Sequence, residues 1–102
     1  MHIILGTEAA DKLRENYTVL ELETFNHKGQ DITAYCVVSQ VPIMELPQLE
    51  NDRRLHADFI DEYKKGNYKY CIDAVEHLRG RFNGDLDSFY EVIIERITNN
   101  GQ

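Results

Sequence analysis

The spacing of apolar residues changes at two prolines, Pro42 and Pro47. Before them, apolar side chains alternate with polar ones, which is typical of β-strands with one buried face. After them, apolar residues recur at intervals of three and four, which is typical of amphipathic helices. Because two prolines forbid a continuous helix, an extended connector is expected between the two parts. The chain is therefore predicted to place its strands first and its helices second.

The chain has 102 residues, which is enough for one domain with one core. We expect a single domain, with a sheet part over residues 1–40, a connector over 41–48 and a helical part over 49–98. The connector is expected to pack on the core through Ile43, Met44 and Leu46. The predicted fold class is α+β, with a three-stranded antiparallel sheet and one short helix, followed by a three-helix segment packed on one sheet face.

The first residues predict a short strand followed by a short helix. Residues 2–5 are apolar and β-branched, which is typical of a buried strand, and Gly6 ends it. The hydroxyl of Thr7 can cap the helix by accepting a backbone N–H. Gly6 and Thr7 could also present N–H groups to an anion, but one glycine does not make a phosphate loop. We therefore expect a capped strand-to-helix turn.

Two further strands are predicted to form a β-hairpin. They cover residues 17–25 and 32–39, and Gly29 supplies the turn between them. Because successive side chains of a strand point to opposite faces, one side of the hairpin is predicted to face the helices and the other to face away from them. The helix-facing side contains Leu20, Leu22, Ile32, Ala34, Cys36 and Val38, and the other side of the first strand contains Val19, Glu21, Glu23 and Phe25.

Three helices are predicted in the second part, over about 49–65, 68–79 and 86–98. The junction of the first two resembles the inter-helix turn of a tetratricopeptide repeat over about residues 55–78. The residues that carry the resemblance are Tyr63, Gly66, Asn67, Tyr68 and Cys71. Phe59 departs from the family, which has a small residue there, and no second copy follows. The resemblance implies a tight helical hairpin and not the peptide binding of a repeat array.

Residues 3–10 and 17–25 resemble segments of small uncharacterised proteins encoded by tailed phages of marine cyanobacteria. The sequences concerned are Ile-Ile-Leu-Gly-Thr-Glu-Ala-Ala and Tyr-Thr-Val-Leu-Glu-Leu-Glu-Thr-Phe. The resemblance implies a phage-encoded accessory protein. It implies no particular activity.

The net charge of −7 argues against a general affinity for nucleic acid or anionic membranes. The apolar run at the N-terminus is too short for a signal peptide, and no membrane-spanning stretch follows it. Cys36 and Cys71 lie in apolar patterns, as buried free thiols of a reducing compartment do. We therefore expect a cytoplasmic protein.

Two Asp–His pairs come nearest to a metal site. Asp52 and His56 lie four residues apart, as do Asp73 and His77, and such pairs on packed helices could supply four ligands. His56 lies on the apolar stripe of its helix, however, whereas His77 lies on the polar side of the next one. We expect a histidine at the edge of the core and no metal. The sequence leaves open whether the pairs are more than helix-surface pairs.

No motif of a known catalytic class is present. The candidate nucleophiles are Cys36, Cys71, Ser39 and Ser88, and none has a sequence context that suggests activation. We expect no catalytic and no cofactor-binding residue. The alternative is an enzyme or small-ligand-binding domain whose pocket lies between sheet and helices.

The last helix has more apolar residues than a single packed face requires, which is an arc of about 100°. They are Leu86, Phe89, Tyr90, Val92, Ile93, Ile94 and Ile97. Either the helix runs between the sheet and the helical hairpin, or its spare side pairs with a second copy across a two-fold axis. We predict a homodimer whose interaction surface contains Tyr90, Val92 and Ile94.

The predicted function is that of a small cytoplasmic accessory protein that binds another, unidentified protein. An apolar patch on the folded chain would favour this function. A cleft with converging polar groups would favour the alternative with a pocket.

Overall fold

The three strands and one short helix occupy the first part of the chain and the other helices the second, so the predicted α+β class is confirmed. The computed structural model describes residues 2–38 and 40–100. Ser39, at the end of the predicted strand 32–39, lies outside the described residues. The elements in chain order are β1 (His2–Leu5), α1 (Thr7–Arg14), β2 (Thr18–His27), β3 (Gln30–Val38), the short 3₁₀ turn η1 (Ile43–Glu45), α2 (Leu46–Lys65), α3 (Tyr68–Leu78), the 3₁₀ turn η2 (Phe82–Gly84) and α4 (Asp87–Asn100).

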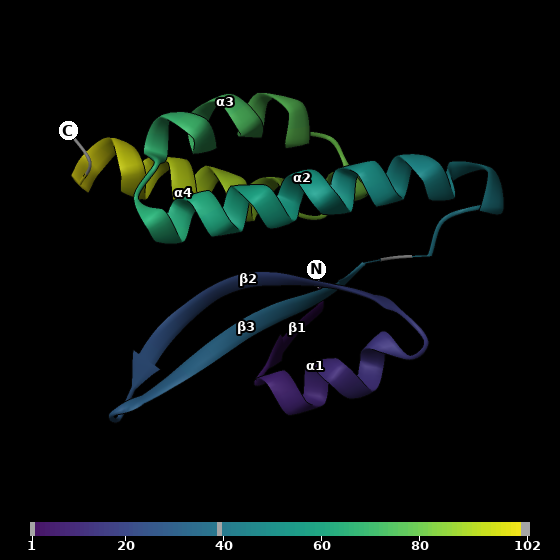
Figure 1. Cartoon of the computed structure of the whole chain (residues 1–102), viewed down its shortest axis with the longest axis horizontal. Coiled ribbons are helices and arrows are strands. Elements are labelled where there is room, and N and C mark those ends of the chain that lie inside the picture. The colour runs from purple at the N-terminus through teal and green to yellow at the C-terminus, as the bar shows by residue number, and fades with distance from the viewer. Residues whose placement is uncertain (1, 39, 101–102) are drawn as a thin grey trace.

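The three strands form an antiparallel sheet in the order β1-β3-β2, with helices on both faces. Helices α2 and α4 cover one face, and α3 lies on their far side from the sheet (Figure 1). Helix α1 covers the opposite face, where Ala10 packs with Val19 and Tyr35. Because β3 is central, β2 and β1 are the two edge strands of the sheet.

The hairpin turn has two residues, Lys28 and Gly29, whose φ angles are 53° and 83°. Two positive φ angles define the type I′ turn, whose twist matches that of the flanking strands. Gly29 adopts a positive φ readily, but Lys28, which has a side chain, adopts the left-handed region as well. The strands therefore extend closer to the turn than the sequence predicts.

A β-bulge in β2 changes which side chains face the helices. Glu21 pairs with Tyr35 but Glu23 pairs with Ala34, so Leu22 is an extra residue. Leu22 still enters the core below the helices, as predicted. Beyond the bulge, however, the alternation is reversed, so Glu23 and Phe25 lie on the helix-facing side. Their predicted assignment to the other side was wrong.

Strand β1 is present, but its predicted burial was wrong. Ile3 and Leu5 pair with Cys36 and Ala34, which puts them on the helix-facing side of the sheet. Both side chains are more than half exposed, so the helices leave this edge uncovered. The predicted cap was also wrong: Thr7 is the first helical residue, and its hydroxyl lies 3.0 Å from the Tyr35 hydroxyl.

Helices α2 and α3 form a tight antiparallel hairpin. Helix α2 ends at Gly66, whose φ of 82° is left-handed, and the Asn67 side chain caps α3 by accepting from the backbone N–H of Tyr70. The Cys71 thiol donates to the Phe59 carbonyl at 3.6 Å. The small size of Cys71 lets the helices approach closely at this point.

The connector does not pack on the core, contrary to the prediction. Ile43 and Met44 are 83% and 92% exposed, and Leu46 is also exposed. Helix α2 begins at Leu46, before the predicted residue 49, and Pro47 lies in its first turn. A proline is tolerated there because the first N–H groups of a helix have no intrahelical partner. Pro47 therefore belongs to the start of a helix.

The bulged residue gives a test of the core. Leu22→Asp places an unpaired charge in a buried position, and the free energy of unfolding should fall by several kcal/mol. The matched control is Leu5→Asp, on the exposed edge strand, which should change it by less than about 1 kcal/mol. Urea unfolding followed by circular dichroism measures both values. A Leu22→Asp variant as stable as the control would show that Leu22 is not part of the core.

Candidate functional site

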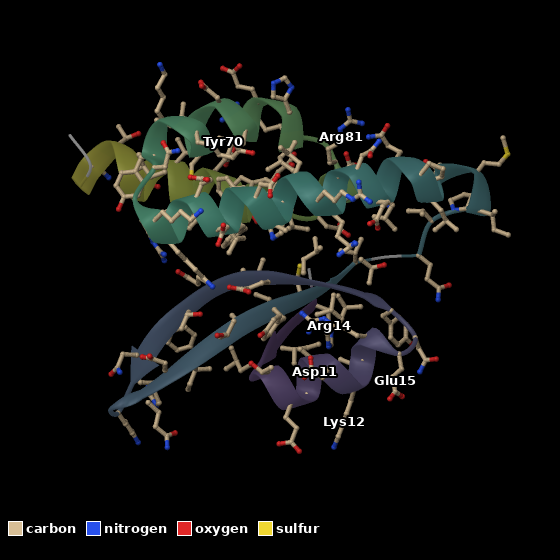
Figure 2. The ribbon with its side chains drawn as sticks, in the orientation of Figure 1. Asp11, Lys12, Arg14, Glu15, Tyr70 and Arg81 are labelled. Carbon is tan, nitrogen blue, oxygen red and sulfur yellow. The ribbon has the colours of Figure 1, made fainter. Side chains whose placement is uncertain are left out.

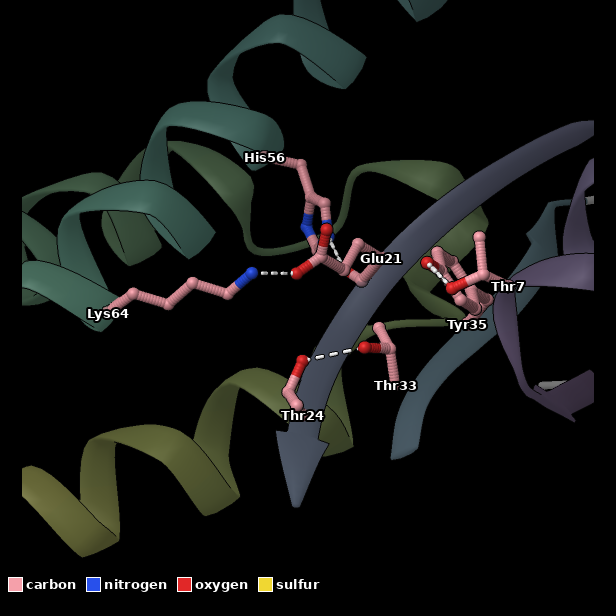
Figure 3. A network of polar contacts seen from close by, with 7 residues as sticks. All are labelled: Thr7, Glu21, Thr24, Thr33, Tyr35, His56 and Lys64. Carbon is pink, nitrogen blue, oxygen red and sulfur yellow. Dashed lines mark hydrogen bonds and ion pairs between the residues drawn. The ribbon is translucent and has the colours of Figure 1, made fainter. Parts of the chain in front are cut away.

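One histidine connects the sheet with two helices. His56, in the middle of α2, is 1% exposed. Its Nε2 lies 2.6 Å from the carbonyl oxygen of Glu21 on β2 (Figure 3). Its Nδ1 lies 2.7 Å from the hydroxyl of Tyr90 on α4. A carbonyl only accepts, so Nε2 carries the proton, and Nδ1 accepts from the tyrosine hydroxyl. Both ring nitrogens are therefore used inside the protein.

Burial keeps this pair uncharged. It lowers the pKa of His56 to about 4 and raises the pKa of Tyr90 well above its usual value. The imidazole and the phenol are both neutral at pH 7. Because both ring nitrogens already form hydrogen bonds inside the protein, we assign His56 a structural role.

A cleft of about 220 Å³ lies beside this histidine, between the edge of β2 and α2. We call it the β2–α2 cleft. Three basic side chains line it: Arg14, Arg53 and Lys64. Each forms an ion pair within the chain, because Arg14 contacts Asp11 at 2.7 Å, Arg53 contacts Glu50 at 2.6 Å, and Lys64 contacts Glu21 (Figure 3). The polar groups of the cleft are thus already paired with one another or with neighbouring carboxylates.

The two Asp–His pairs lie in different surroundings. Asp52 is nearly buried, accepts from the Gln48 amide at 2.9 Å and lies 3.6 Å from the Arg81 guanidinium. Asp73 and His77 are exposed on α3. Within residues 2–38 and 40–100, no group of three or more His, Cys, Asp or Glu side chains could hold a metal ion.

Neither cysteine is an activated nucleophile. Cys36 and Cys71 are free, as predicted, and lie in the core. Burial raises the pKa of each thiol to about 11, so both are protonated at neutral pH. Ser88 is exposed in the first turn of α4, while Ser39 lies outside the described residues.

A second candidate surface lies at the end of the sheet where the connector starts. Two depressions of about 380 Å³ and 350 Å³ adjoin there, and both are lined by Tyr17, Val38 and Gln40. We call them together the end groove. Its remaining lining residues are of two kinds. The apolar ones are Leu13 and Val37 in the first depression and Val41, Leu46 and Leu49 in the second, and the polar ones are His2, Arg14, Asn16 and Thr18.

An apolar projection stands beside the end groove. Ile43 and Met44, which we call the connector tip, lie in the chain between Val41 and Leu46, and both of these line the groove. The tip side chains are almost entirely exposed and take no part in the core. Sequence reasoning missed this surface because it assigned all apolar connector residues to the core. The available signal was a short apolar run between two prolines, without strand or helix spacing.

The predicted interaction surface on α4 is only partly accessible. Tyr90 is fully buried against His56, so its assignment to a surface was wrong. Ile94 is half-buried against the core, and Val92 is 45% exposed. The reason for the error is that α4 lies deeper than a one-sided helix: α3 and the sheet bury neighbouring parts of its circumference. Of the three predicted surface residues, Val92 is exposed, whereas Tyr90 and Ile94 pack against the core.

Comparison with known proteins supplies no family for the chain. No protein-family model matches it, and no curated protein or solved structure matches it significantly. Among the described helices, none is both long and apolar enough to cross a membrane. The functional interpretation therefore depends on the two surfaces described above.

Acid is expected to destabilise the fold through His56. Its pKa is about 4 in the folded chain and 6.5 as a free side chain, so between these values only the unfolded chain takes up the proton. The contribution of His56 is complete above pH 6.5, falls as the pH drops towards 4 and changes no further below that. Each pKa unit is worth about 1.4 kcal/mol, so the loss amounts to about 3 kcal/mol.

A glutamine variant isolates this effect. His56→Gln removes the titrating group, and other groups change stability with pH in both proteins alike. The difference in unfolding free energy between wild type and variant, measured with urea at several pH values, should shrink by about 3 kcal/mol from pH 7 to pH 4. A difference independent of pH would mean that folding does not lower the pKa of His56.

Proposed function

We propose that this chain is a protein-interaction module and that the connector tip and the end groove form its binding surface. The observation that carries the proposal is the near-complete exposure of Ile43 and Met44 beside a groove lined by both apolar and polar side chains. Single exposed apolar residues are common on proteins, but a contiguous set of them marks an interaction surface. Here the tip, Leu46 and Tyr17 form such a set.

The β2–α2 cleft supports the alternative less well, although it lies between sheet and helices where a ligand pocket was expected. It is lined by His56, whose two ring nitrogens already form hydrogen bonds inside the protein. A ligand would also have to displace the carboxylates that already pair with Arg53 and Lys64. We therefore favour binding of a protein over binding or conversion of a small molecule.

The proposal includes a cytoplasmic location and an accessory role. Free thiols at Cys36 and Cys71 suit a reducing compartment. The net charge of −7 disfavours nucleic acid as the partner, because phosphate binding depends on an excess of Lys and Arg. An apolar surface on another protein remains as the best match for the tip and the groove.

Recovery of the tagged protein from its native host tests this function. Wild type should bring down a specific protein, and the double variant Ile43→Glu with Met44→Glu should lose at least about nine-tenths of it, since two charges oppose apolar contact. The matched control is Ile72→Glu, which changes an exposed apolar residue on the distant α3. Equal recovery by wild type and the double variant would contradict the proposed surface.

A further inference from the structure

We propose that the partner of this surface is a second copy of the chain, with the connector tip of each copy seated in the end groove of the other. This inference rests on the proposed function, because it names the partner of the same surface. The two copies would be related by a two-fold axis, so that the same contact is made twice.

The surface is complementary to itself. Val41 and Leu46 line the groove, and the tip projects between them in the chain, so groove and projection lie at the same end of the molecule. The tip does not fill the groove of its own chain, because Ile43 and Met44 remain exposed. In a second copy related by a two-fold axis, the connector tip would face the end groove of the first copy.

The shape of the groove suits the two tip side chains. It consists of two adjoining depressions that share Tyr17 and Val38, and the tip supplies two neighbouring apolar groups. Ile43 is branched and stiff, while Met44 is unbranched and fits irregular spaces. One depression is available for each side chain.

Charge distinguishes a second copy from an arbitrary apolar partner. Glu45 directly follows the tip, and Arg14 lines the groove. Arg14 lies on the sheet-facing side of α1, where it contacts Asp11 and lies 5.3 Å from the centre of the Tyr35 ring (Figure 2). When a tip enters the groove of the other copy, its Glu45 approaches the Arg14 guanidinium, which is 46% exposed beside Asp11 and has further N–H donors for a second carboxylate. The projection and the groove are thus matched in charge as well as in polarity.

Light scattering on the purified full chain gives the first test. At about 100 µM, wild type should have a mass near 24 kDa, twice the 11.9 kDa of one chain. Ile43→Glu with Met44→Glu should be monomeric, and Val92→Glu, at an exposed position of α4, should stay dimeric. Circular dichroism shows whether each variant has kept the fold. A monomeric wild type would overturn the proposal, as would a dimer that Val92→Glu dissociates and the tip variant does not.

A charge exchange tests how the tip is seated. Glu45→Arg and Arg14→Glu should each raise the dimer dissociation constant about three- to tenfold, and the two together should return it towards the wild-type value. A double variant no tighter than the single ones would overturn the proposed seating. A monomeric wild type overturns self-association only. The proposal that the surface binds a protein is contradicted by a different result, equal recovery by wild type and the tip variant.

Discussion

The hydrogen bonds of His56 determine how the helical layer sits on the sheet. The ring donates to the Glu21 carbonyl on β2 and accepts from the Tyr90 hydroxyl on α4, so one side chain of α2 fixes three elements. The bulge at Leu22 interrupts the regular ladder beside Glu21, and the carbonyl there accepts from a group outside the sheet. Around the ring, Phe59 and Tyr90 pack edge to face with centroids 5.3 Å apart. The polar pair is thus buried without charge beside these aromatic rings.

The position at which His56 fixes α2 on the sheet also determines where the connector lies. Helix α2 is 20 residues long and is held near its middle by His56 and near its end by the Lys64–Glu21 ion pair. Its first turns therefore extend past the sheet, as the right-hand side of Figure 1 shows. The connector has to reach the start of this helix, where residues 80–83 adjoin Val41 and Glu45 but leave Ile43 and Met44 exposed. The exposure of Ile43 and Met44 thus follows from where α2 is fixed.

The sequence predicts those features that depend on local spacing and fails where a distant contact decides. The order of strands and helices, the turn at Gly29 and the hairpin at Gly66 follow from periodicity and backbone preference. The bulge was missed because Leu20, Glu21, Leu22 and Glu23 alternate perfectly, and only pairing with β3 reveals the extra residue. Tyr90 was assigned to a surface because its partner, His56, is 34 residues away. For the candidate surface, the sequence shows that Ile43, Met44 and Leu46 are apolar. Hydrophobicity alone does not distinguish residues that pack on the core from residues that are exposed.

The exposed tip is better explained by binding than by folding. Polar residues in place of Ile43 and Met44 would cost the fold little, because neither side chain contacts the core, and they would reduce aggregation. The backbone around the tip is restricted: Pro42 precedes η1, and Pro47 lies in the first turn of α2. A segment held in one conformation loses less entropy when a partner binds it than a flexible loop does. In the proposed dimer, an apolar tip between two prolines is therefore a preorganised contact, and the groove of the other copy supplies the matching half.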